Sequence, residues 1–387
     1  MAAWRTNGRV ECATFAIRSG WGSIDTLGFT GEYGPPAVAM SANGDAMAAW
    51  DSGLQSAVHV MRRPSGSIFW ESVDLPGGSI VEQSPRLGMD EDGGAIVTWA
   101  EAGTGVWIAR FLAGVGWERH HVLEPLAYSA YHDVAVAARG MVTVPYVFFR
   151  NAPPPGGEPL PPRWQTCGIH LRTTGALAKA VDCVEPPWRA YASEMLAVAG
   201  PDGRTLAVWA EPQAYGGWPA RAAASWEPGH GWTARAPLGA GWEVAPAIDG
   251  RGGAFVLRSS DETEHTHLWA HRFEAERGWL PAEDLMTPGA SSRFGSANVA
   301  MEATGGAWAA WDENREGSNR LITRRYVPGA GWDSPFAIAV QTGGALLGPR
   351  VVVDGRGGGL FVWVEIPPEG GAGSIVARRY VADTNGR

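Results

Sequence analysis

The fold is decided by the stretch at residues 304–332, which reads TGGAWAAWDENREGSNRLITRRYVPGAGW. Residues 44–70 follow the same plan and read GDAMAAWDSGLQSAVHVMRRPSGSIFW. Both stretches have a glycine six residues before a tryptophan, then a polar gap, an arginine-bearing run and a closing aromatic residue. We interpret the stretch as one copy of a repeated unit and not as a site.

The distance from glycine to aromatic residue is constant along the chain. The pairs are Gly44 and Trp50, Gly93 and Trp99, Gly140 and Tyr146, Gly203 and Trp209, Gly305 and Trp311, and Gly357 and Trp363. A short β-prone run, strand a, precedes the turn glycine, and strand b leads from it to the tryptophan. Strand c carries the arginines, and a second glycine-rich turn delivers strand d. Four antiparallel strands in about 50 residues form the period of a propeller blade.

The sequence therefore predicts an all-β protein, a β-propeller of four-stranded antiparallel blades in a single domain, 1–387. Seven blades are favoured and eight are the alternative. In the seven-bladed form, the last blade takes three strands from residues 349–380 and is closed by the strand at Trp21, with VECATFAI (10–17) as an outer fifth strand. The predicted repeat units are 1–30, 31–80, 81–128, 129–190, 191–242, 243–292, 293–344 and 345–387.

Tryptophan is abundant, with 20 residues, and most of them fall in two columns of the repeat. A four-stranded sheet cannot bury both faces alone, so we expect large flat side chains to fill the space between neighbouring blades. The column at the end of strand b holds Trp4, Trp50, Trp99, Trp209, Trp311 and Trp363, and the column at the start of strand d holds Trp21, Trp70, Trp117, Trp232, Trp279 and Trp332. The unit that starts at Pro246 is shorter and places Arg258 in the first column, with Asp261 or Glu262 as its expected partner.

Composition excludes several classes of function. The net charge is -9 and the only lysine is Lys179, so no basic stripe for nucleic acid is present. The longest apolar stretch, 134–149, is interrupted by Arg139, Gly140 and Pro145, and we expect no membrane span. The N-terminus has no signal-peptide pattern, so either the protein is cytoplasmic or its true start lies upstream. We expect a monomer without cofactor.

The three cysteines have no metal-binding spacing. Cys167 and Cys183 flank one predicted hairpin and could pair in an oxidising compartment, although buried free thiols are the favoured interpretation. His265, His267 and His271 share one face of a predicted strand and could hold a metal ion, but an exposed strand without metal is favoured. No metal site is therefore predicted.

The order of strands, with an arginine-bearing strand followed by Gly-x-Gly-Trp, resembles the blade of bacterial sialidase-type propellers with BNR (Asp-box) repeats. The turns RPSGSIFW and YVPGAGW keep the glycine and tryptophan of that box but lack its serine and aspartate. The resemblance implies the architecture and an extracellular or cell-surface location. It implies little for catalysis, because no Arg-Ile-Pro motif of those enzymes precedes any strand a.

Candidate ligand-binding residues lie where strand a begins, because the innermost strands of a propeller line its channel. Polar residues occupy the first position of strand a in four of seven units, Arg86, Asp133, Asn298 and Arg350, whereas Ala37, Leu196 and Ala247 occupy it elsewhere. An aqueous channel is the least costly place for such groups, although salt bridges within its wall are an equal alternative. The linkers before strand a add Tyr33, Glu82, Tyr191, Trp242 and Arg293, which could stack on sugar rings or on a peptide.

These residues predict a non-catalytic module that binds a carbohydrate or a protein surface. The alternative is a sialidase-like glycoside hydrolase or lyase at the channel mouth, which needs two carboxylates, or a tyrosine and a glutamate, within about 5–10 Å of each other. No catalytic residue is assigned.

Overall fold

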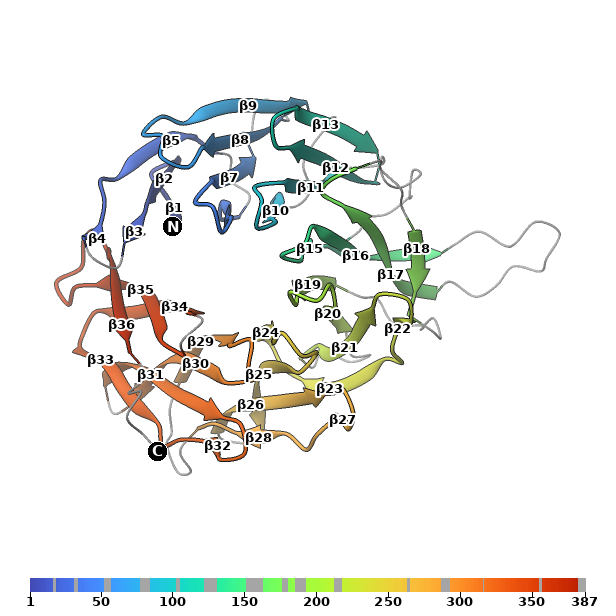
Figure 1. The fold of residues 1–387 in the computed structure, drawn as a ribbon. Coiled ribbons are helices and arrows are strands. Elements are labelled where there is room, and N and C mark those ends of the chain that lie inside the picture. The colour runs from blue at the N-terminus through green and yellow to red at the C-terminus, as the bar shows by residue number, and fades with distance from the viewer. Residues whose placement is uncertain are drawn as a thin grey trace. The chain divides into compact units, whose positions relative to one another are not determined.

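The computed structural model describes 15 segments of the chain, and their regular elements are all β-strands (Figure 1). The described segments are 1–16, 19–30, 34–51, 57–76, 84–101, 105–121, 131–150, 163–175, 180–184, 193–211, 218–262, 265–286, 293–315, 317–354 and 357–381. None of these segments contains a helix long and apolar enough to cross a membrane. The chain divides into two compact units, the first made of residues 1–209 and 225–234 and the second of residues 210–224 and 235–387.

The first unit contains four complete antiparallel sheets, which we call blades 1 to 4. Blade 1 is formed by β1 (Ala2–Thr6), β2 (Arg9–Ala13) and β5 (Asp25–Phe29), with the separate pair β3 (Phe15–Ala16) and β4 (Gly20–Trp21). Blade 2 is formed by β6 (Ala37–Met40), β7 (Ala46–Asp51), β8 (Ala57–Arg63) and β9 (Glu71–Pro76). Blade 3 is formed by β10 (Arg86–Met89), β11 (Ala95–Glu101), β12 (Gly105–Leu112) and β13 (Gly116–His121). Blade 4 is formed by β14 (Tyr131–His132), β15 (Ala135–Val136), β16 (Met141–Arg150), β17 (Arg163–Arg172) and β18 (Ala180–Cys183).

The second unit contains three complete sheets, blades 6 to 8, and the unit boundary passes through blade 5. Blade 5 is formed by β19 (Ser193–Ala199), β20 (Thr205–Glu211), β21 (Ala220–Glu227), β22 (Gly231–Trp232) and β23 (Ala236–Ala240). Blade 6 is formed by β24 (Val244–Ile248), β25 (Ala254–Glu262), β26 (His265–Glu274), β27 (Gly278–Trp279) and β28 (Glu283–Asp284). Blade 7 is formed by β29 (Arg293–Met301), β30 (Ala307–Arg315), β31 (Ser318–Val327), β32 (Gly331–Trp332) and β33 (Phe336–Thr342). Blade 8 is formed by β34 (Ala345–Val353), β35 (Gly359–Ile366) and β36 (Ser374–Tyr380).

Consecutive blades contact each other through their first strands. In the first unit β1 contacts β6, β6 contacts β10, β10 contacts β15, and β14 contacts β19. In the second unit β24 contacts β29, and β29 contacts β34. Small antiparallel sheets that pack in sequence order through their first strands form a β-propeller, so the predicted fold class is confirmed.

The favoured count of seven blades is wrong, since eight such sheets occur among the described residues. β4, which carries Trp21, pairs with β3 and not with the last blade. β2, which was expected to be an outer fifth strand, is the central strand of blade 1 between β1 and β5. The N-terminal residues thus build a blade of their own, with β3 and β4 as a separate pair.

The two tryptophan columns lie at different depths. In the strand-b column Trp50, Trp99, Trp209, Trp311 and Trp363 are at most 3% exposed, while Trp4 is half-buried. The tryptophans of the strand-d column are all half-buried. Trp99 of blade 3 packs against Val58, Val60 and Leu75 of blade 2. The strand-b indoles therefore fill the space between neighbouring blades, as the repeat predicts.

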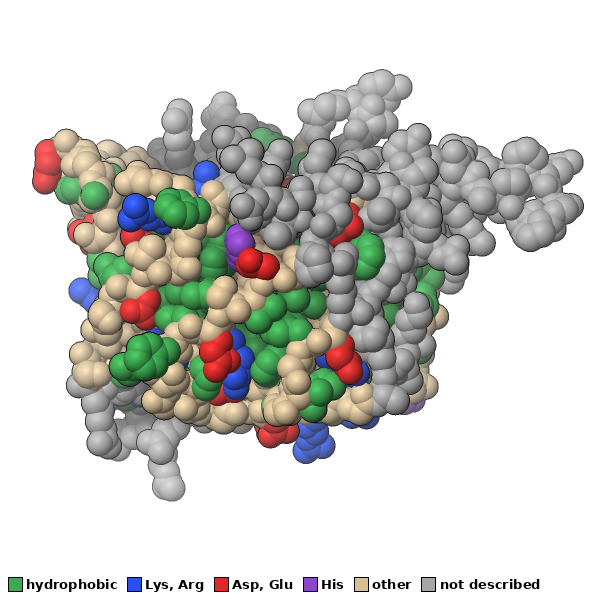
Figure 2. All heavy atoms as spheres, turned by 90° about the horizontal axis from the view of Figure 1, so that it is seen from above, with side chains coloured by type: hydrophobic (Ala, Val, Ile, Leu, Met, Phe, Trp, Pro, Cys, Tyr) green, Lys and Arg blue, Asp and Glu red, His purple; other side chains and the backbone are tan. Residues whose placement is uncertain are grey.

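The arginines of strand c bind acidic residues of the turn between strands a and b. Arg62 lies 2.8 Å from Asp45 in blade 2, and Arg325 lies 3.3 Å from Glu302 in blade 7. The same turn in blade 7 bends at Gly305, whose φ of 93° requires glycine. Figure 2 shows that acidic and basic side chains alternate with hydrophobic ones on one face of the molecule. Arg379 of blade 8 likewise lies 3.1 Å from Asp354, so in these three blades the strand-c arginine holds the turn of its own repeat.

The favoured interpretation of the cysteines as free thiols is wrong for two of the three. Cys167 of β17 and Cys183 of β18 are directly paired across the two strands and form a disulfide. Cys12 is the third cysteine, and it is free and buried. Burial raises the pKa of the Cys12 thiol to about 11, so this residue stays protonated and unreactive at neutral pH.

Candidate functional site

The nine predicted ligand-binding residues fall into three groups. Tyr33, Glu82 and Tyr191 lie outside the described residues. Arg293 is the first residue of β29, where its backbone pairs with Asn314, and its side chain lies outside the described part. The remaining five residues are divided between the two units. Arg86 and Asp133 belong to the first unit, and Trp242, Asn298 and Arg350 belong to the second.

Asp133 joins two neighbouring blades of the first unit. Its Oδ1 accepts a hydrogen bond from the Val134 amide, and its Oδ2 accepts one of 2.8 Å from the Ala197 amide of blade 5. Arg86 Nε lies 3.8 Å from the same carboxylate. Burial raises the pKa of Asp133, and the charge of Arg86 and the two amides oppose this effect. Asp133 therefore connects the first strands of two neighbouring blades.

Asn298 makes the equivalent connection in the second unit. Its Oδ1 accepts a hydrogen bond of 2.9 Å from the Val351 amide of blade 8. Arg350, the neighbour of Val351, is exposed, and among the described residues its Nη1 donates to the carbonyl of Pro349, at 3.4 Å. Arg350 thus offers an exposed cation, whereas the side chain of Arg86, which is 39% exposed, faces Asp133.

Blade 6 contains an acidic residue that the sequence analysis missed. The turn glycine of blade 6 is Gly252, with a φ of 81°, and Ala245 pairs with Leu257 in the register that Ala37 and Ala49 have in blade 2. The first position of strand a is therefore Ala245 and not Ala247, because the proline used as an anchor lies two residues later than in the other units. The corrected alignment places Glu243 immediately before β24, next to Trp242.

Glu243 lies among charges from three other elements. Burial raises the pKa of its carboxyl, against the opposing charges of Arg350 and Arg221 and a hydrogen bond from the Ala297 amide. The charge of Asp312, at the end of strand b in blade 7, raises this pKa further. Glu243 is fixed in place because its backbone exchanges hydrogen bonds with Ser259 of β25.

Asp312 is a second carboxyl with a raised pKa, which burial causes. It is 7% exposed, and its Oδ1 accepts hydrogen bonds of 2.8 Å from both the amide and the hydroxyl of Ser296. The neighbouring Gly295 leaves room for this carboxylate, since a Cβ there would collide with it. Glu243 and Asp312 are thus two carboxyls that favour the protonated state more than free carboxyls do, in a region with an exposed arginine.

Trp242 lies against a second tryptophan, Trp218, which lies outside both tryptophan columns of the repeat. The two ring centroids are 4.8 Å apart and the rings are tilted by 47°. Trp218 is 50% exposed, and Trp242 is half-buried. We call this pair the tryptophan platform. It presents an aromatic surface to solvent beside Glu243.

The tryptophan platform is held by the pairing of β21 with β23. Ala220 pairs with Ala240 directly beside the two indoles, and the Gly241 amide donates to the Pro219 carbonyl at 3.0 Å. Arg221, which is 2% exposed, donates from its guanidinium to the carbonyls of Gly241 and Trp242. These bonds fix both ends of the platform before a ligand arrives, so binding there costs little ordering entropy.

Arg258 forms hydrogen bonds near the end of β23, close to the tryptophan platform. It is 6% exposed, and it donates to the carbonyl of Ala240 and, at 3.3 Å, to Nε2 of His271. Gly241 must be glycine because a Cβ there would collide with the carbonyl of Ser259. The expected partners Asp261 and Glu262 have side chains outside the described part. The replacement of the column tryptophan by Arg258 therefore brings a hydrogen-bond donor to the end of β23.

Two histidines of β26 have other partners. His267 pairs with Asp284 at 2.7 Å, and His271 accepts from Arg258. Burial and the charge of Arg258 lower the pKa of His271 to about 4, so it is neutral at pH 7. The side chain of His265 is outside the described part, and no group of three or more metal-ligating side chains occurs among the residues that are described.

Comparisons with known proteins extend to the fold alone. No protein-family model matches the chain, and no curated protein resembles it. Among solved structures, puromycin hydrolase matches with a TM-score of 0.54 and 19% identity over 91% of this chain and 54% of the hydrolase. The polysaccharide lyase Uly1 matches with a TM-score of 0.53 and 10% identity over 94% of each chain. A PL25 ulvan lyase bound to -[GlcA(1-4)Rha3S]- matches with a TM-score of 0.50 and 10% identity over 87% of this chain and 91% of the lyase.

Proposed function

We propose that the protein binds a carbohydrate at the tryptophan platform of its second unit. The observation that carries this proposal is the position of Trp218, which is 50% exposed and lies 4.8 Å from Trp242. An indole offers a flat apolar surface that matches the apolar face of a sugar ring, and tilted neighbouring indoles can contact two faces of a saccharide. Solvent exposure of such a pair has no benefit for stability, which favours a binding role.

Polar groups next to the tryptophan platform suit the hydroxyl and acidic groups of a saccharide. Glu243 follows Trp242 directly in the chain, and the exposed Arg350 lies within electrostatic range of Glu243. Binding sites for small molecules combine aromatic surface with a few such polar groups. A ligand ring on the tryptophan platform would place its substituents toward this pair of charges.

The structural neighbours agree with a carbohydrate ligand at the level of the fold. Two of them are polysaccharide lyases, and one of these is bound to a saccharide. Another neighbour is a puromycin hydrolase, so the fold alone does not select a ligand. A protein surface stays the alternative partner, because an exposed tryptophan pair also suits a protein interface.

The proposal is tested by glycan-array screening of the full chain, followed by calorimetric titration of the strongest binder. Trp218→Ala and Trp242→Ala are expected to weaken binding by about tenfold or more, which corresponds to at least about 1.4 kcal/mol. Phe69→Ala is the matched control, since Phe69 is an aromatic residue that is 74% exposed in the first unit. Equal affinity of all four proteins would reject the tryptophan platform as the site.

A second candidate function is cleavage of the bound polysaccharide. It is favoured by Glu243 and Asp312, two interacting carboxyls in which burial raises the pKa, since a general acid must keep its proton more readily than a free carboxyl does. The test is to incubate the protein with the polysaccharide that it binds and to measure new reducing ends. Loss of product with Glu243→Gln, with unchanged binding, would support an enzyme, whereas no product from the unmodified protein would leave binding as the function.

A further inference from the structure

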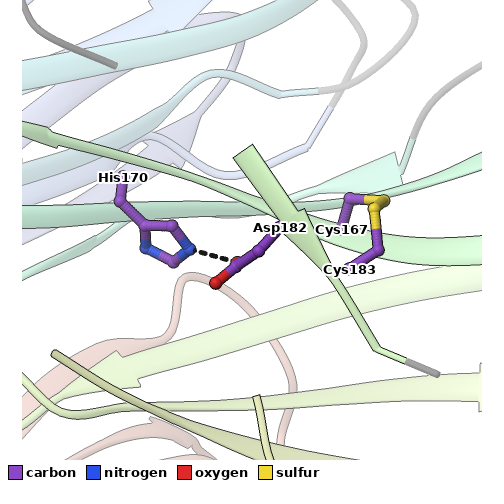
Figure 3. The surroundings of a disulfide bond; sticks show 4 residues. All are labelled: Cys167, His170, Asp182 and Cys183. Carbon is purple, nitrogen blue, oxygen red and sulfur yellow. Dashed lines mark hydrogen bonds and ion pairs between the residues drawn. A yellow bond between two sulfur atoms is a disulfide. The ribbon is translucent and has the colours of Figure 1, made fainter. Parts of the chain in front are cut away.

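The outer strand of blade 4 is short and is held by the Cys167–Cys183 disulfide. β18 has four residues and pairs only with β17, at the edge of its sheet. Most other blades begin this strand with Gly-Trp, but blade 4 has no tryptophan there. Cys183 pairs directly with Cys167 of β17 (Figure 3). The disulfide thus replaces the packing that a tryptophan gives to the outer strands of the sibling blades.

Asp182, the neighbour of Cys183, links β18 to two partners. Its Oδ1 accepts from Nε2 of His170 on β17, at 2.7 Å, as Figure 3 shows. Its Oδ2 accepts from the indole Nε1 of Trp226 at 3.0 Å. The rings of His170 and Trp226 stack with centroids 3.8 Å apart. The Asp182 carboxylate therefore holds the side chains of His170 and Trp226 against each other.

The network continues into the buried part of the first unit. Nδ1 of His170 lies 3.1 Å from the hydroxyl of Thr143, and that hydroxyl lies 3.0 Å from the hydroxyl of Thr205. Both threonines are 1% exposed. Since buried polar groups are costly without their partners, displacement of Asp182 would leave His170 and Trp226 without the acceptor that they share.

The accessibility of the two sulfurs is unequal. Cys167 is 1% exposed, whereas Cys183 is half-buried on the edge strand next to Val181, which is 52% exposed. Cys183 is therefore the more exposed of the two bonded cysteines and the favoured point of attack for an external thiolate. The leaving sulfur is then the buried one, and it is held beside its former partner by the sheet.

We propose that Cys183 is a thiol-exchange site at which a dithiol reductant opens the disulfide and releases β18 from blade 4. One thiolate of the reductant attacks Sγ of Cys183, the S–S bond breaks, and its electron pair passes to Sγ of Cys167. The second thiolate then attacks the reductant's own sulfur in the mixed disulfide and frees Cys183. Two electrons and two protons pass to the protein, and the reductant leaves as a cyclic disulfide.

Release of β18 carries Asp182 away from His170 and Trp226, so the change is local to these strands. Strands held by four residues and one cross-link open without unfolding of the whole sheet when the cross-link is removed. The proposal does not depend on carbohydrate binding, since all its residues lie in the first unit.

The test is hydrogen exchange with mass spectrometry on the full chain, with and without dithiothreitol, combined with alkylation of free thiols. The Cys12→Ser variant serves as background, because it removes the one free cysteine. With reductant, Cys167 and Cys183 are expected to become alkylated, and the amides of Val181 to Val184 are expected to exchange about a hundredfold faster. That factor corresponds to about 2.7 kcal/mol at 1.36 kcal/mol per tenfold change. The amides of β12 in blade 3 are expected to stay unchanged.

Two results would overturn the proposal. One is full alkylation of both cysteines with unchanged exchange in β18, and the other is alkylation only under conditions that also expose β12. The double variant Cys167→Ser and Cys183→Ser should show fast exchange in β18 without reductant and no response to it. If the double variant does not fold, the comparison of the unmodified cysteines with and without reductant still decides between these outcomes.

Discussion

Trp311 and Trp218 show that the same side chain has two roles in the second unit. Trp311 at the end of strand b is 1% exposed and packs in a cluster with Leu257 and Leu268 of the preceding blade. Trp218 lies just before β21, is 50% exposed and lies against Trp242, two residues after the end of β23. The position in the repeat separates them, because Trp311 follows its turn glycine by six residues and Trp218 does not. The buried tryptophans of the strand-b column are thus structural, whereas Trp218, which lies outside both columns and is exposed, is the candidate for binding.

Removal of a periodic tryptophan is expected to have the largest effect on stability. Trp311→Ala leaves a cavity between blades 6 and 7 and removes an indole N–H that donates to Glu313 at 3.3 Å. We expect the free energy of unfolding to fall by about 3–5 kcal/mol, measured by urea denaturation. Trp218→Ala is the control and should change it by less than about 0.5 kcal/mol. Equal losses in the two variants would remove the distinction between the two classes of tryptophan.

Arg258 gives a further test of the two classes of tryptophan, because it occupies the strand-b column of blade 6 in place of an aromatic residue. Arg258→Ala removes the donor to His271 and to the carbonyl of Ala240, both close to the tryptophan platform. We expect a loss of about 2 kcal/mol in the free energy of unfolding, because buried acceptors lose their partner. Arg277→Ala is the matched control, since Arg277 is 67% exposed and pairs only with Glu274. A loss no larger than that of the control would show that Arg258 does not support this edge.

The hydrogen bonds that Asp133 and Asn298 form between first strands are expected to have the smallest effect on the free energy of unfolding. That effect depends on pH. The pKa of Asp133 is raised in the folded protein, so the folded state binds a proton more tightly than the unfolded state does. The contribution of this residue is therefore present at low pH and is lost as the pH rises through the folded pKa. Asp133→Asn should remove that loss. As the pH rises from about 4, the free energy of unfolding of the original protein should therefore fall relative to that of the variant.

Asn298→Asp is the reciprocal change, since Asn298 makes the same contact with a neutral amide. The variant should gain a free energy of unfolding that falls as the pH rises, which is the dependence that Asp133→Asn removes. Denaturation curves between acid and neutral pH measure both variants. The same slope in all three proteins would show that burial does not set the proton affinity at this position.

Much of the fold was readable because the repeat has local rules. A glycine with positive φ, a strand and a buried aromatic residue six positions later recur with fixed spacing in six of the blades. The number of blades was harder to predict because Trp21 could close the last blade or belong to the first, and only strand pairing separates the two. Pairing between distant strands has no local signal in the sequence.

The candidate site was predicted only in part. Trp242, Asn298 and Arg350 were identified, but Glu243 was missed because Pro246 misaligned the first strand of blade 6 by two residues. Trp218 was not identified, since its contact with Trp242 depends on the pairing of β21 with β23. The disulfide was left open because spacing alone does not give the redox state of two cysteines.

The central claim is that Trp218 serves a ligand and not the fold. Its most direct test is one titration of Trp218→Ala and of the original protein with the saccharide selected by the glycan array, together with the unfolding curve of each. The account predicts at least about a tenfold rise in Kd with an unchanged unfolding midpoint. An unchanged Kd, or a weaker Kd that follows a lowered midpoint, would contradict it.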